Sequence, residues 1–262
     1  MKRESKTKSS LFYEKHLFLF YMKKSILSIK FIVCFILILI PIFQILSELE
    51  YTTIFNQRDL DKNMFWQRFI GSYSQMALIL ISVIIAADIV SGEFSNKSAM
   101  IIYATESRYK ILTIKLLCLI ISIFILMLFY FSAFLIMIFI KTDLLISIPI
   151  FLTAFLIIFV ELIFYSSLTF MVSAITRSIN LSYILPFFYI LINPFLDYYE
   201  LGLLSFNSYK LRVFDFFTNL FFSKIIELNA VTIFCFIFFF GVSLLIILLT
   251  FYIFNQIDIR VD

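Results

Sequence analysis

Residues 116–140 read LLCLIISIFILMLFYFSAFLIMIFI, a run of 25 consecutive residues without one charged side chain. The hydrocarbon core of a bilayer is about 30 Å thick, and roughly 20 apolar residues in a helix cross it because a helix satisfies its backbone hydrogen-bonding groups internally. The whole chain is 63% hydrophobic, well above the roughly 45–50% of a soluble domain. We therefore expect an integral membrane protein, and soluble enzyme chemistry is a poor first interpretation.

Other long apolar stretches accompany this run. We expect one all-α, polytopic transmembrane domain over residues 1–262, with six spans at 26–46, 69–90, 111–140, 144–172, 181–196 and 228–254. The basic stretch before the first span resembles a secretory signal, but no small-residue cleavage site follows it, so we expect an uncleaved span. The preceding sequence, SLFYEKHLFLFYMKKS at 10–25, alternates apolar and basic residues in a way typical of an N-terminal helix lying in the headgroup region.

The basic residues predict the orientation. When Lys and Arg are assigned to the gaps between the expected spans, 14 of the 21 fall on one side, including the N-terminal stretch and the C-terminal tail. The positive-inside rule then places both termini in the cytoplasm of a cell-membrane protein. Most of these residues flank apolar runs, so the formal charge of +4 reflects topology and no nucleic-acid partner is expected.

The chain offers few residues for catalysis or cofactor binding. Its four glycines, Gly71, Gly92, Gly202 and Gly241, lie too far apart to form a phosphate-binding or dinucleotide-binding loop. The three cysteines fall one per apolar run, without metal-ligand spacing, and are expected to pack inertly. We expect a non-catalytic chain that binds no cofactor or metal itself.

The most informative polar stretch is SGEFSNKSAMIIYATESRYKILTIKLL, residues 91–117. An acidic residue follows the second span, then a short semi-apolar helix, then a polar turn with Arg108 and Lys115 seven residues apart. This order resembles the permeases of the ABC-2 type transporter family. Glu93 stands at that family's acidic position, 107–108 at its Ser-Arg and Lys115 at its final Lys. The sequence departs from the family pattern because Lys97-Ser98 replaces Gly-Thr, no proline lies near 106, and an isoleucine precedes Lys115.

The resemblance implies the permease subunit of an ATP-driven exporter. Such a subunit pairs with a second permease chain, identical or related, and with P-loop ATP-binding subunits that hold the ATP. Its segment 91–110 would dock on an ATP-binding subunit and pass motion to the spans. A coupling element needs charge and apolar contact, which several side chains supply: Glu93, Phe94, Lys97, Met100, Ile101, Tyr103 and Arg108. The alternatives are solvated loop charges and, for Arg108 and Lys115, anchors that reach to the membrane surface.

Glu161 is the charged residue expected deep inside a span. It needs a donor or a proton there, and Tyr165, one helical turn on, is the nearest candidate in sequence. Both residues could line a translocation path, or they could be a hydrogen-bonded packing contact. A second interpretation is an ion-coupled secondary transporter that uses Glu161. A third, a lipid-modifying membrane enzyme, lacks the clustered His, Asp, Glu and Ser that such chemistry needs.

The fifth expected span, 181–196, is short and contains Pro186 and Pro194. At about 1.5 Å per residue it reaches only some 24 Å. We expect it to be broken or to be supported by short helices in the external segment 197–227.

Overall fold

The computed structural model describes residues 15–26, 28–40, 42–43, 74–95, 98, 102–103, 107–141, 148–199, 205–221 and 229–256. Regular secondary structure in these ranges is helical, which confirms the all-α class. A helical segment at 15–26 precedes the named helices. These are α2 (Ile29–Leu37), α5 (Ser74–Ser95), α7 (Arg108–Lys141), α8 (Ile148–Thr176), α9 (Ile179–Tyr198), α10 (Phe206–Phe221) and α11 (Ala230–Gln256).

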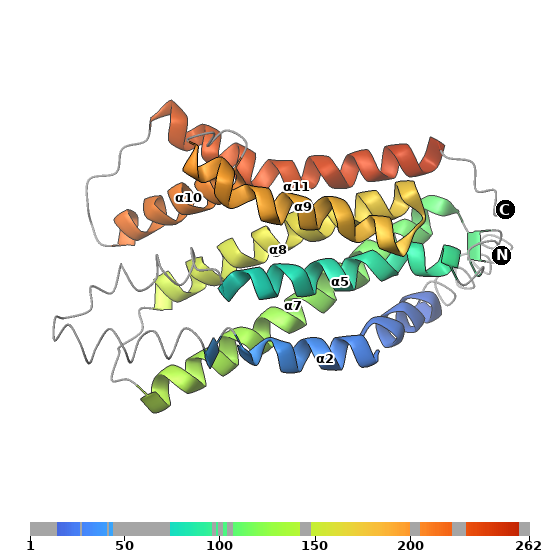
Figure 1. Cartoon of the computed structure of the whole chain (residues 1–262), viewed down its shortest axis with the longest axis horizontal. Coiled ribbons are helices and arrows are strands. Elements are labelled where there is room, and N and C mark those ends of the chain that lie inside the picture. The colour runs from blue at the N-terminus through green and yellow to red at the C-terminus, as the bar shows by residue number, and fades with distance from the viewer. Residues whose placement is uncertain are drawn as a thin grey trace, which may run out of the picture.

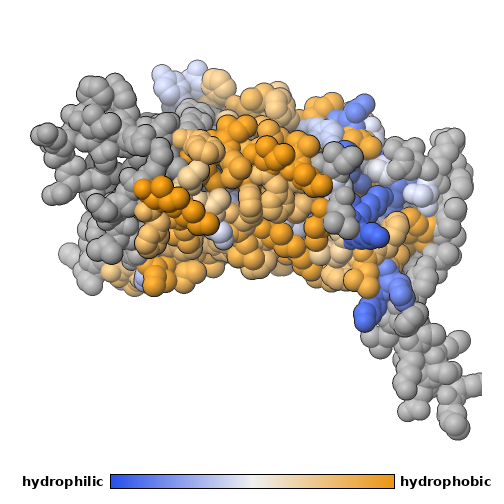
Figure 2. Space-filling view, turned by 90° about the horizontal axis from the view of Figure 1, so that it is seen from below, coloured by the Kyte–Doolittle hydropathy of each residue, from blue (hydrophilic) through white to orange (hydrophobic). Residues whose placement is uncertain are grey.

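Four of the described helices are long and apolar enough to cross a bilayer, at Met76–Phe94, Arg108–Met137, Ile148–Thr176 and Ala230–Gln256. They lie within α5, α7, α8 and α11 and match the second, third, fourth and sixth expected spans. Figure 2 shows an apolar surface over the middle of the molecule with hydrophilic side chains toward its ends. These features are those of a multi-pass membrane protein. The first and fifth expected spans correspond to α2 and α9, whose apolar helical stretches are shorter.

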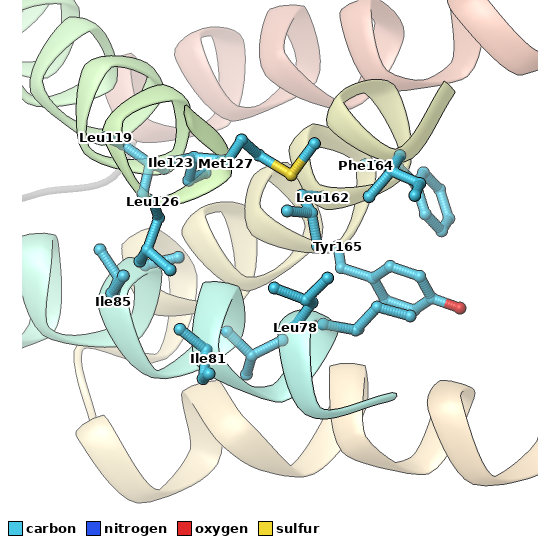
Figure 3. Packing of buried hydrophobic residues seen from close by; sticks show 14 of the residues in the cluster. Leu78, Ile81, Ile85, Leu119, Ile123, Leu126, Met127, Leu162, Phe164 and Tyr165 are labelled. Atoms are coloured by element: carbon cyan, nitrogen blue, oxygen red, sulfur yellow. The ribbon is translucent and has the colours of Figure 1, made fainter. Parts of the chain in front are cut away.

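Helix α8 is the centre of the bundle and contacts α5, α7, α9, α10 and α11 (Figure 1). Its apolar residues meet those of α5 and α7 in one core, where Leu162 faces Leu78 and Met127 (Figure 3). Several hydroxyls of α8 are satisfied within the helix; Ser166, for example, donates to the carbonyl of Leu162 at 2.6 Å. Such bonds let polar residues lie in an apolar bundle at little cost.

Close approach of α5 and α8 extends α5 past its expected end at residue 90. The backbone N–H of Ser91 donates to Ser173 Oγ at 2.9 Å, and that hydroxyl donates to the carbonyl of Ala87 at 3.0 Å. Small residues at this crossing let the two backbones approach. The polar residues at 91–95 are therefore helical, because their hydrogen bonds go to protein rather than to water.

Helix α9 runs unbroken through Pro186 and Pro194. The support expected for this short span comes from the chain that follows it: Ser205 donates to Asn193 Oδ1 at 3.0 Å, and the backbone N–H of Phe206 donates to Tyr189 Oη at 3.2 Å. Helix α10 thus starts alongside α9, inside the bundle.

The described ends of the chain lie together. Tyr21 of the segment 15–26 packs with Ile114 and Cys118 of α7, and Phe254, near the end of α11, contacts Tyr103 at a ring-centroid distance of 5.5 Å. All lie at the end of the bundle that holds Glu93, which we call the Glu93 end (right in Figure 1). The side of the membrane that this end faces stays a prediction.

Candidate functional sites

A buried polar cluster occupies the Glu93 end. Glu93, on the last turn of α5, accepts hydrogen bonds from Lys115 Nζ of α7 and from Tyr21 Oη, the latter at 2.5 Å. Lys115 also donates to Tyr103 Oη at 3.1 Å. The side chains of Glu93 and Lys115 are both 0% exposed. We call these four residues, Tyr21, Glu93, Tyr103 and Lys115, the Glu93 cluster.

The cluster surrounds one cation with acceptors and ring faces. Lys115 Nζ lies 5.4 Å from the ring centroid of Tyr21 and 5.2 Å from that of Tyr103, so two π faces add to the carboxylate. Burial raises the pKa of both tyrosines, and the neighbouring Glu93 carboxylate raises it further. Both phenols are protonated at neutral pH; that of Tyr21 donates to Glu93, and that of Tyr103 accepts from Lys115. Removing one charged partner would leave the other buried and uncompensated.

Aromatic contacts extend the cluster to two further helices. Phe94 stacks on Tyr103 with ring centroids 6.0 Å apart, and Tyr103 packs in turn on Phe254 of α11. The guanidinium of Arg177 lies 5.2 Å over the Phe94 ring. Arg177 ends α8 in a left-handed conformation, with φ of 55°. The connection between α5 and α7 is thereby tied to the turn between α8 and α9 and to α11.

This geometry corrects two residue assignments made from the sequence. Glu93 is enclosed by Lys115 and Tyr21, so it cannot present a surface charge to a partner. Lys115 has no exposed side-chain surface, so the interpretation as a membrane-surface anchor is wrong. Phe94 is buried and Arg108, the first residue of α7, is partly exposed. The remaining expected coupling residues, Lys97, Met100 and Ile101, lie outside the described residues.

A second buried ion pair joins α8 to α10. Lys210 Nζ lies 2.9 Å from Glu161 Oε1 and 3.1 Å from Oε2, and both side chains are almost fully buried. We expected Tyr165 as the donor to Glu161, whereas Lys210 fills that role. Tyr165 accepts a hydrogen bond from Asn193 Nδ2 at 3.4 Å. Glu161 lies near the middle of α8, so the lysine reaches deep into the bundle.

Aromatic packing fixes the start of α10 beside this pair. Phe206 stacks on Phe164 with centroids 4.1 Å apart and planes at 4°, and on Phe239 of α11 at 5.0 Å. The sequence interpretation missed Lys210 by counting it among external charges. Its signal was the helical spacing of buried residues in α10: Phe206, Tyr209, Lys210, Val213 and Phe214.

Among the described residues, no three His, Cys, Asp or Glu side chains gather closely enough to hold a metal ion. No protein-family model matches the chain. A search of curated proteins also found no match. The two buried ion pairs, Glu93–Lys115 and Glu161–Lys210, are the features of the described residues that bear on function.

Proposed function

We propose that this chain is the permease subunit of an ABC-2 type exporter, with six spans and a separate ATP-binding subunit that docks at the Glu93 end. The observation that carries the proposal is the Glu93 cluster. It fixes the ends of α5 and α7 to each other and to the N-terminal helical segment. Because its ends are held in this way, the connection between α5 and α7 would move as one unit and pass the motion of a partner subunit to these two helices.

The coupling role belongs to the connection as a unit. Glu93 and Lys115 act as positioning residues that hold the connection, and its outer surface makes the partner contact. Ser107 and Tyr109 are exposed there. Through Phe94, Arg177 and Phe254 the same motion reaches the α8–α9 turn and α11. ATP-driven closure of two partner subunits would then shift the bundle between two packed states.

A pair of permease chains completes the transporter. The apolar helices α9 and α11 leave large side chains exposed, among them Phe188 and Leu248. In a membrane these faces meet lipid or a second permease chain. Export of a substrate along the interface of such a pair is the activity we assign.

Cysteine cross-linking tests the docking site. In a background with Cys34, Cys118 and Cys235 replaced by alanine, Ser107→Cys should cross-link to a P-loop ATPase encoded next to this chain and coexpressed with it. Ile148→Cys, at the opposite end of α7–α8 and 72% exposed, is the matched control. Reconstituted with the ATPase, the chain should export substrate only with hydrolysable ATP.

Two results would contradict the proposal. One is a yield of cross-linked ATPase that is the same for Ile148→Cys as for Ser107→Cys. The other is intrinsic ATP hydrolysis by the purified chain alone.

The Glu161–Lys210 pair favours one second candidate, an ion-coupled secondary transporter. A buried carboxylate with a lysine partner can exchange a proton when the pair opens. Glu161→Gln keeps the size of the side chain and its hydrogen bonding but removes the ionisable group. Transport that survives this substitution and still needs ATP would exclude the carrier, whereas proton-driven transport lost in the variant would favour it.

A further inference from the structure

A cavity of about 340 Å³ opens beside the Glu93 cluster, between the segment 15–26, α2, α5 and α7. Its lining contains residues of two kinds. Apolar residues of α2 and α5 contribute Phe31, Ile84, Ile85 and Ile89. Polar and charged residues contribute Lys24, Ser25, Ser28, Lys30 and Asp88.

The charges of the lining do not balance. Asp88 pairs with Lys30, so among the described residues that line the cavity Lys24 is a second ammonium group without a carboxylate partner. Lys24 is exposed, and Lys30 is 59% exposed, so both ammonium groups can reach a ligand. Among the described lining residues, one carboxylate accompanies two ammonium groups, so this part of the lining carries a net charge of about +1.

The depth of the cavity in the membrane further restricts the class of ligand that fits it. Asp88 lies six residues before Phe94, where the apolar stretch of α5 ends, which is about 9 Å along the helix axis. With the apolar stretch of α5 placed in the acyl region, the cavity would reach from the headgroups into the acyl chains. Basic pockets between transmembrane helices at this depth suit the headgroups of anionic lipids.

We propose that this cavity binds one anionic phospholipid, with the headgroup phosphate on Lys24 and Lys30 and the glycerol and upper acyl chains against Phe31, Ile84 and Ile89. The lipid would join the segment 15–26 to α5. A zwitterionic lipid fits less well because its own ammonium group lies close to both lysines. A free phosphate ester has no part that matches the apolar wall. This inference does not depend on the proposed transport function.

The test is native mass spectrometry of the purified full-length chain, delipidated and incubated with phosphatidylglycerol or phosphatidylcholine of the same acyl composition. Wild type should retain one phosphatidylglycerol about five-fold better than phosphatidylcholine. One lysine close to an anionic lipid increases its affinity by about this factor. Lys24→Gln should remove most of this preference, and Lys24→Arg should restore it. Lys23→Gln makes the same charge change one residue away, outside the cavity, and should behave as wild type.

A second variant tests the apolar wall. Ile89→Trp fills the cavity without changing charge, so it should reduce retention of the single phosphatidylglycerol. Glycerol 3-phosphate should not compete in wild type. Equal retention of the two lipids, equal losses in Lys24→Gln and Lys23→Gln, full retention in Ile89→Trp, or competition by glycerol 3-phosphate would each overturn the proposal.

Discussion

Glu93 and Lys115, 22 residues apart, form an ion pair in which neither side chain is exposed. We predict first that Lys115→Met, which leaves the buried Glu93 carboxylate with Tyr21 as its donor among the described residues, costs about 3–5 kcal/mol of stability. Glu93→Gln/Lys115→Met should recover much of this loss because no buried charge remains.

The measurement is the apparent melting temperature of each purified variant in detergent. Lys23→Met, at an exposed position in the segment 15–26, is the control and should stay close to wild type. A double variant less stable than Lys115→Met would argue against the pair as the cause.

The hydrogen bond from Tyr21 to Glu93 should make stability depend on pH. The ordinary tyrosine pKa is about 10, and in the folded chain burial and Glu93 raise it. A raised pKa contributes stability that is fully present below about pH 10 and is lost above it, because only the unfolded chain then releases the proton. Tyr21→Phe should therefore be less stable than wild type at pH 8, by about 1.5–3 kcal/mol for a bond to a charged group. The difference should shrink between pH 10 and 11. A constant difference over this range would exclude the linkage.

The Glu161–Lys210 pair should behave as an energetic unit. Lys210→Met leaves the Glu161 carboxylate without its lysine in the middle of α8. It should lower the stability of the folded chain by several kcal/mol, as does the breaking of other buried pairs. Glu161→Gln/Lys210→Met should be substantially more stable than Lys210→Met alone. Arg212→Met, on the exposed face of α10, is the matched control. Additive losses in the double variant would mean that the two side chains do not interact.

The expected orientation can be checked at exposed positions. With native cysteines replaced, an impermeant thiol reagent added to intact cells should label Arg212→Cys and should not label Ser107→Cys. Ile148→Cys, which is 72% exposed at the end of the bundle opposite Glu93, should also be labelled in intact cells, and lysed cells should label all three variants, which controls for reactivity. Labelling of Ser107→Cys in intact cells would invert the topology and would remove the docking site from the cytoplasm.

Hydropathy predicted α7, α8 and α11 to within a few residues, since a long uncharged run in a bilayer has few alternatives to a helix. It ended α5 too early because Ser91 and Glu93 look like loop residues in isolation. Their partners, Ser173 and Lys115, come from other helices, and no local pattern specifies them.

The sites were also predicted incompletely, because the partners of their polar residues come from distant parts of the chain. The sequence singled out Glu161 because it lies among apolar residues of a span, and Glu93 because of its place in the order of residues 91–117. It could not supply Lys210, which arrives from 49 residues away through the packing of α10. The sequence also left Lys24 and Lys30 as ordinary flanking lysines, whereas the fold places them around one cavity.

The position of Lys210 has a consequence for biogenesis. A lysine deep in an apolar bundle is costly until it meets its carboxylate, so α10 cannot take its final place on its own. Its site needs Glu161 of α8, Asn193 of α9 and Phe239 of α11, and α11 is made after α10. Glu161 is synthesised before Lys210, whereas Phe239 follows it, so the packing around α10 is complete only once α11 is in place.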